Sequence, residues 1–138
     1  METPTDQSIL VTGGAGFIGS HLVEALVADN DVVVLDNLSS GRREWVDSRA
    51  TLIEADLHDA QAVDRAVDGV DYIFHEAANV SVEHSVDAPV ESHETNVDAT
   101  LQLLEHARSE DARFIYASSA AVYGTPASVP IDESDPKQ

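Results

Sequence analysis

The stretch SILVTGGAGFIGSHL, residues 8–22, decides how this chain folds. Its first five residues, Ser8–Thr12, are mostly apolar and β-branched, which predicts a strand. Three glycines follow at G-x-x-G-x-x-G spacing, and apolar residues then recur at helical intervals, which predicts a helix over Phe17–Ala28. A strand, a glycine-rich turn and a helix in this order are typical of the first unit of a parallel sheet wound with crossover helices.

The three glycines of this turn have separate tasks. Gly13 allows the tight turn, Gly16 lets the backbone approach a pyrophosphate without a Cβ in the way, and Gly19 lets the helix pack close to the strand. The free N–H groups and the positive end of the helix dipole would then hold the anion. The alternative is an ordinary strand-to-helix turn without a ligand.

A carboxylate at the end of the second predicted strand favours a nucleotide site. Asp36 ends the strand Val32–Asp36, 17 residues after Gly19. Dinucleotide sites have an acidic residue at about this distance, which binds the ribose hydroxyls of the adenosine. Asp36 would repel a 2′-phosphate, so NAD is favoured over NADP. Arg42 and Arg43 could soften that preference, but we expect them to face solvent in a loop helix.

The rest of the chain repeats this alternation of strands and helices. Further strands are predicted over Thr51–Ala55, Tyr72–Ala77 and Phe114–Ser118, and further helices over Asp59–Val67 and Pro89–Ser109. Several strands are apolar throughout, as expected when both faces of a sheet are covered. The long helix has Val97, Leu101 and Leu104 on one face. The sequence predicts an α/β fold with a doubly wound parallel sheet of about five strands.

The domain organisation is simple. Residues 1–124 are expected to form one nucleotide-binding domain, because the chain is too short for a second independent core. Residues 125–138 hold three prolines among mostly polar residues, which predicts a loop or tail.

The composition excludes several classes of function. The chain has 138 residues and no cysteine, which excludes disulfides and thiolate metal sites, and its six histidines lack ligand spacing, so no metal is expected. The formal net charge of −19 leaves no basic face for nucleic acid. No stretch approaches the roughly 20 apolar residues of a membrane helix, so we expect a soluble, cytoplasmic protein without membrane contact. The acidic surface suits a salt-rich cytoplasm, which predicts a halophilic source.

Five segments in order resemble a known family. VTGGAGFIGSHL, LDNLSSG, HEAANVSV, ETNVDATLQLLE and FIYASSAAVYG are similar to segments of the extended short-chain dehydrogenases/reductases, the NAD-dependent epimerase/dehydratase family. The resemblance covers nearly the whole chain. It implies a Rossmann-type fold, a tightly held NAD and a nucleotide-sugar substrate. It also allows a homodimer, since family dimers pair through helices that include the one with Asn96.

The resemblance also implies the site residues, position by position. The cofactor contacts are Gly13, Gly16, Phe17, Ile18, Gly19, Asp36, Asn37, Ser40, Gly41, Asp56, Leu57, Ala77, Ala78 and Asn96. Asn96 matches the helix asparagine that supports the active site, although asparagines near helix starts often only cap backbone groups. Ser119 matches the catalytic serine. Its residue context agrees, because it leaves a strand at the edge where open α/β sheets bind ligands and could stabilise a forming carbonyl. The alternative is a serine without function.

The two residues after Ser119 distinguish the reactions of the family. Nucleotide-sugar dehydratases have an acid and a base there, and related decarboxylases tend to have a glutamate. Ala120 and Ala121 can supply no proton. An epimerase needs only hydride removal from C4, rotation of the keto-sugar and hydride return. The resemblance therefore favours a nucleotide-sugar 4-epimerase.

The family's catalytic tyrosine, with a lysine four residues later, has no match. Tyr72, Tyr116 and Tyr123 all lack a lysine at that spacing, and the element would fall a few residues beyond Gln138. We therefore expect a fragment that binds NAD and is inactive by itself. The alternatives are a non-catalytic NAD-binding module, or part of a dehydratase, decarboxylase or reductase.

Overall fold

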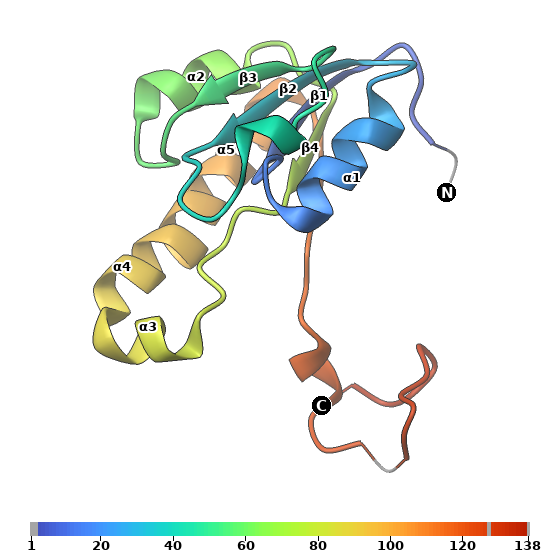
Figure 1. The fold of residues 1–138 in the computed structure, drawn as a ribbon, viewed down its shortest axis with the longest axis vertical. Coiled ribbons are helices and arrows are strands. Elements are labelled where there is room, and N and C mark those ends of the chain that lie inside the picture. Colours follow the sequence, from blue (N-terminus) through green and yellow to red (C-terminus); the bar gives the residue numbers. More distant parts are fainter. Residues whose placement is uncertain (1–2, 127, 138) are drawn as a thin grey trace.

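Five parallel strands form the sheet at the centre of the structure, a computed structural model that describes residues 3–126 and 128–137 (Figure 1). The strands are β1 (Ser8–Thr12), β2 (Asp31–Asp36), β3 (Thr51–Glu54), β4 (Tyr72–His75) and β5 (Arg113–Tyr116). Their order is β3-β2-β1-β4-β5, so the connections run outward from β1 in both directions. The predicted α/β class and the parallel sheet are confirmed.

Three strands end earlier than the sequence predicts, the third by a single residue, at Glu54 in place of Ala55. The fourth was expected to run to Ala77 and the fifth to Ser118, but they end at His75 and Tyr116. His75 pairs with Thr12 on one side and with Tyr116 on the other, and Thr12 is the last residue of β1. Because β1 ends at Thr12, strand pairing between β1 and β4 stops at His75. The residues after His75 leave the strand and lie along the carboxyl edge of the sheet.

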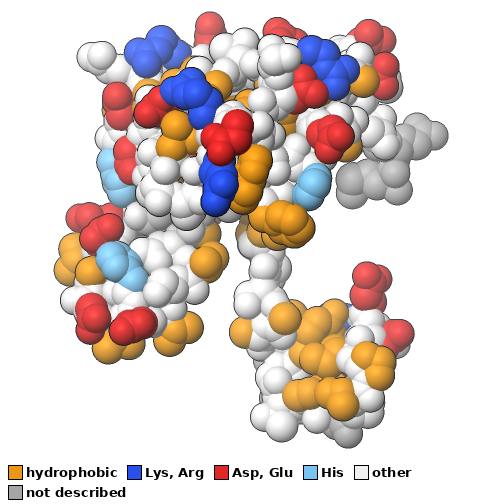
Figure 2. Space-filling view, viewed as in Figure 1, with side chains coloured by type: hydrophobic (Ala, Val, Ile, Leu, Met, Phe, Trp, Pro, Cys, Tyr) orange, Lys and Arg blue, Asp and Glu red, His pale blue; other side chains and the backbone are white. Residues whose placement is uncertain are grey.

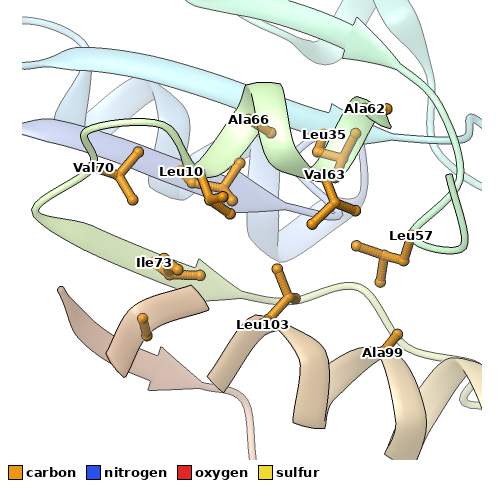
Figure 3. Packing of buried hydrophobic residues seen from close by; sticks show 12 residues of the cluster. Leu10, Leu35, Leu57, Ala62, Val63, Ala66, Val70, Ile73, Ala99 and Leu103 are labelled. Carbon is orange, nitrogen blue, oxygen red and sulfur yellow. The ribbon is translucent and has the colours of Figure 1, made fainter. Parts of the chain in front are cut away.

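Helices cover both faces of the sheet. α1 (Phe17–Leu26) packs on one face, whereas α2 (Ala60–Val67) and α5 (Ala99–Glu110) pack on the other (Figure 1). The first face buries Ile9, Val11, Val23, Leu26 and Val34, and the second buries Leu10, Leu35, Val63, Ile73 and Leu103 (Figure 3). Neighbours along β1 therefore point to opposite cores, and its central residues Ile9, Leu10 and Val11 are all apolar because each lies in one of them.

The single helix predicted over Pro89–Ser109 is built of three segments. α4 (Pro89–His93) is followed by a π-helical segment (Glu94–Asp98) and then by α5. The hydroxyl of Thr100 donates a hydrogen bond to the carbonyl oxygen of Asn96 at 2.9 Å, and such back-bonding bends helices. π-Helical insertions are frequent at functional sites.

The helical region also differs from the sequence prediction in two other ways. A short helix, α3 (Val82–Asp87), precedes α4, where the sequence analysis placed no element. Its apolar pattern is too short to show a helical period. The face with Val97, Leu101 and Leu104 is exposed by 48%, 57% and 42%, because α5 packs on the sheet through Ala99, Leu103 and Ala107 instead.

After β5 the chain leaves the sheet and runs away from it as an arm (Figure 1). The arm begins with a 3₁₀ helix (Ala120–Tyr123) and continues through turns and bends over residues 124–126 and 128–137. Within the described ranges, no helix is both long and apolar enough to cross a membrane.

Candidate functional site

A cleft of about 570 Å³ opens at the carboxyl ends of β1 to β4. The strand order reverses between β1 and β4, and open α/β sheets bind their ligands at such a switch point. The cleft is lined by these predicted cofactor residues: Gly13, Gly16, Asp36, Asn37, Ser40, Gly41, Asp56, Leu57, Ala77 and Ala78. Residues distant in the sequence are thus brought to one surface.

The glycine turn forms one wall of the cleft. Gly13 has φ +69°, and a Cβ there would lie 2.7 Å from the backbone nitrogen of Ala77. A Cβ on Gly19 would lie 2.2 Å from the Gly13 carbonyl oxygen, so this glycine lets α1 pack against the turn. At Gly16 the nearest atom would be the same oxygen at 3.2 Å, so an added methyl group would extend into the cleft.

The start of α1 presents backbone N–H groups at this wall. Gly16 is the N-cap residue and supplies no side chain to bond the first amides of the helix. The N-terminal amides of a helix and its dipole favour an anion. Phe17 and Ile18 follow in the first turn, but their side chains are 72% and 59% exposed and do not line the cleft.

Asp36 lies at the end of β2, with only 9% of its surface exposed. Its Oδ2 accepts a hydrogen bond from the backbone N–H of Ala15 at 2.9 Å, and its Oδ1 accepts one from Leu38 at 2.8 Å. Each carboxylate oxygen can accept a second hydrogen bond. Asp36 therefore fixes the loop after β2 and retains capacity for a ligand hydroxyl.

Asn37, Asp56 and His58 form a polar cluster at the same end of the cleft. Asn37 donates to Asp56 Oδ2 at 2.7 Å, and the backbone N–H of His58 donates to Oδ1 at 3.0 Å. Burial raises the pKa of the Asp56 carboxyl, but the hydrogen bonds from His58 and Asn37 outweigh it, so the pKa lies below its usual value. Asp56 is therefore a fixed anion at neutral pH.

The segment Ala77–Asn79 forms the opposite wall of the cleft. Asn96 does not line the cleft but holds this segment from behind: Asn79 N–H donates to Asn96 Oδ1 at 2.7 Å, and Asn96 Nδ2 donates to the Asn79 carbonyl at 2.8 Å. Through these two hydrogen bonds the π-helical segment, which contains Asn96, fixes the position of Asn79 in the cleft wall.

Ser119 lies on the arm and does not line the cleft. It caps the 3₁₀ helix, where its Oγ accepts a hydrogen bond from the backbone N–H of Ala121 at 3.2 Å. The described structure therefore does not bring Ser119 together with Asn96 and the glycine turn.

The two arginines after Asp36 point away from the cleft. Arg43 pairs with Glu54, and the guanidinium of Arg42 lies over the Trp45 ring, 5.2 Å from its centre. Both side chains are exposed and pair with neighbours, Arg42 with Glu44 of the same loop and Arg43 with Glu54 of β3, which agrees with the expectation that they face solvent.

Sequence reasoning missed several lining residues. These are Leu35, Ser39, Ala55, His58, Glu76, Asn79, Val80, Ser81, His84, Glu91, Glu94 and Thr95. Some of them, such as Asn79, Val80 and Ser81, lie within the motif HEAANVSV, and their place in that motif could have predicted them. His84, Glu91 and Glu94 come from α3, α4 and the π-helical segment, whose position beside the cleft only the structure reveals. Burial raises the pKa of the Glu76 carboxyl in this wall.

Comparison with known proteins gives one consistent result. The model of the NAD dependent epimerase/dehydratase family matches residues 9–138. A putative UDP-glucose 4-epimerase from Methanocaldococcus jannaschii is 42% identical over 133 residues, which are 93% of this chain and 43% of the relative. The UDP-glucose 4-epimerase of Azospirillum brasilense is 40% identical over 98% of this chain and 40% of its own length.

Solved structures agree with these sequences. A UDP-N-acetylglucosamine 4-epimerase from Methanobrevibacter ruminantium superposes with a TM-score of 0.84 at 40% identity, over 98% of this chain and 45% of the other. The Thermus thermophilus UDP-glucose 4-epimerase in complex with NAD gives a TM-score of 0.82 at 41% identity, over 95% and 44%. The chain spans less than half the length of these relatives.

Proposed function

Since this chain belongs to the NAD-dependent epimerase/dehydratase family, we propose that its cleft binds NAD and that the chain is the cofactor-binding part of a nucleotide-sugar 4-epimerase of the UDP-glucose 4-epimerase type. The observation that supports NAD most directly is the position of the buried Asp36 carboxylate beside the glycine turn in one cleft. Donor amides for a pyrophosphate and an acceptor for ribose hydroxyls stand on the same surface.

Each wall of the cleft is assigned a part of the dinucleotide. The amides at Gly16 and the start of α1 would hold the pyrophosphate. Asp36 and Asn37, with Ser40 and Gly41 of the next loop, bind the adenosine ribose. Asp56 and Leu57 would hold the adenine, and Ala77 and Ala78 would form the surface beneath the cofactor. Phe17, Ile18 and Gly19 form the first turn of α1, beside the proposed pyrophosphate site. The carboxylate of Asp36 selects against a 2′-phosphate.

When bound, NAD supplies the hydride acceptor for oxidation at C4 of the sugar. Ser119 is assigned the hydroxyl that hydrogen-bonds the substrate oxygen, and Asn96 supports the site through Asn79. Ala120 and Ala121 leave no group for acid–base elimination, which favours epimerisation over dehydration.

A second candidate is a non-catalytic NAD-binding module. It is favoured by Ser119, whose hydroxyl caps a helix on the arm outside the cleft. In this case the chain holds the cofactor and does not by itself act on a sugar.

The partner of this chain in solution is proposed to be a second copy. Val90, Val97, Leu101 and Leu104 leave apolar surface exposed along α4 to α5. Figure 2 shows apolar side chains between acidic ones over the region of α3 and α4. A cytoplasmic location in a halophilic cell completes the proposal, since a net charge of −19 is best tolerated where salt screens it.

Calorimetric titration with NAD and NADP at high salt tests this function. Saturable NAD binding, at least about tenfold tighter than NADP binding, is expected, because Asp36 repels the extra phosphate. Asp36→Ala and Gly16→Val should abolish or strongly weaken it, whereas Asp31→Ala, at the exposed start of the same strand, should not. A folded chain that binds no NAD would overturn the proposal.

A further inference from the structure

A ring of hydrogen bonds closes behind the cleft through the side chain of His75. His75 Nδ1 lies 2.7 Å from Thr12 Oγ1, and His75 Nε2 lies 2.8 Å from Thr100 Oγ1. Thr12 is the last residue before the glycine turn, and its Oγ1 accepts the backbone N–H of Ala77 at 3.3 Å. Thr100 donates to the carbonyl of Asn96 at 2.9 Å.

The ring is closed on the other side by Asn96. Its side chain accepts the N–H of Asn79 and donates to the Asn79 carbonyl. The wall segment Ala77–Asn79 is therefore hydrogen-bonded at both ends. Ala77 is connected to His75 through Thr12, and Asn79 is connected to it through Asn96 and Thr100. His75 itself is 6% exposed and does not line the cleft.

The donors in the ring determine the tautomer of the imidazole. The single hydroxyl proton of Thr100 is donated in the hydrogen bond to the Asn96 carbonyl oxygen. The contact between Thr100 Oγ1 and His75 must therefore have Nε2–H of His75 as the donor. Nδ1 is then unprotonated and accepts the hydroxyl proton of Thr12, whose oxygen remains available for Ala77 N–H. Burial lowers the pKa of His75, which favours this neutral form.

We propose that His75 is a positioning residue for the cofactor, which sets the separation of the Ala77–Asn79 wall from the glycine turn through Thr12 and Thr100. This inference rests on the proposed NAD binding. The two walls are in direct contact, since a Cβ on Gly13 would lie 2.7 Å from Ala77 N. A displacement of the segment therefore changes the space between the two walls.

Thr100 allows a test outside the cleft. Thr100→Val keeps the shape of the side chain but leaves Nε2–H of His75 without its acceptor, and Thr100→Ser restores the hydroxyl. NAD affinity, measured by calorimetry, should fall about tenfold in Thr100→Val and return to within about twofold of wild type in Thr100→Ser. His75→Asn, whose shorter amide can bond Thr12 but does not reach Thr100, should show the same loss and serves if Thr100→Val does not fold.

Two further measurements separate positioning from stability. Hydrogen exchange at the Ala77 and Asn79 amides should be faster in folded Thr100→Val than in Thr100→Ser. Circular dichroism confirms that each variant is folded during the titration. If a folded Thr100→Val or His75→Asn binds NAD as tightly as wild type, the role of His75 is overturned while the proposed function stands. A wild-type chain that binds no NAD overturns the proposed function itself, and this inference with it.

Discussion

The carboxylate of Asp36 accepts a hydrogen bond from the backbone N–H of Ala15 at 2.9 Å, so the end of β2 holds the glycine turn that follows β1. The second oxygen holds the loop after β2 through Leu38. One buried side chain thus shapes two walls of the cleft, and its loss should affect folding as well as binding.

Asp36→Asn should lower the free energy of unfolding by about 2 kcal/mol, because one backbone N–H then faces an amide N–H₂ in place of a carboxylate oxygen. Urea denaturation at constant salt measures it. Asp31→Asn removes the same charge from the exposed start of β2 and should change the free energy by less than about 0.5 kcal/mol. Equal losses in the two variants would show that charge, and not the hydrogen bonds, is responsible.

Gly19→Ala and Gly16→Ala should separate folding from binding. A Cβ on Gly19 meets backbone at 2.2 Å, so this variant should lose about 3 kcal/mol of stability. A Cβ on Gly16 meets one oxygen at 3.2 Å and extends into the cleft, so it should cost less than about 1 kcal/mol but weaken NAD binding at least about tenfold. Denaturation and calorimetry on both variants decide the matter; full NAD affinity in Gly16→Ala would contradict the assigned pyrophosphate contact.

His75 should make stability depend on pH. Its pKa is lowered in the folded state from 6.5, so between 6.5 and the lowered value the unfolded chain binds more protons than the folded one. The stabilising contribution is complete above 6.5 and is lost as the pH falls from 6.5 toward the lowered value. The fall in unfolding free energy from about pH 7.5 to about pH 5.5 should therefore be smaller in His75→Gln than in wild type. His21→Gln, at an exposed position on α1, is the control and should keep the wild-type difference.

Leu101 should contribute to self-association. It is 57% exposed on α5, beside Val97 and Leu104. Leu101→Glu should raise the dimer dissociation constant at least about tenfold, because a charge would be buried in an apolar contact. Sedimentation equilibrium measures it. Val129→Glu, at an 80% exposed valine of the arm, should leave association unchanged. A wild-type chain that stays monomeric at high concentration would exclude the dimer.

Salt should stabilise this chain. Figure 2 shows acidic side chains spread over the visible face with few basic ones between them, and the net charge is −19. Screening over about 3 Å at 1 M salt, against about 10 Å at 0.1 M, weakens this repulsion. The midpoint of urea unfolding should therefore rise between about 0.1 M and about 2 M KCl. Equal midpoints at both concentrations would contradict the halophilic assignment.

The structure shows which parts of the site follow from local sequence. The glycine spacing alone predicts the turn after β1, and the distance from Gly19 along the chain predicts Asp36. Both predictions are local because the turn and Asp36 belong to one strand–helix–strand unit. Cleft residues from α3 and α4 could not be found in this way. His84 and Glu91 lie at the cleft because α3 packs on α4 beyond the edge of the sheet (Figure 1), and no periodicity in a short helix records that contact.

The sequence by itself determined the α/β class, the parallel sheet and the position of the glycine turn, because strand and helix periodicity and glycine spacing are local properties of the backbone. Only the tertiary structure decided which face of α5 is buried and how Asn96 bonds Asn79. It alone also decided that His75 joins Thr12 and Thr100. These contacts link residues 17 to 63 positions apart, and which of the available polar partners a buried group meets depends on packing that no single segment specifies.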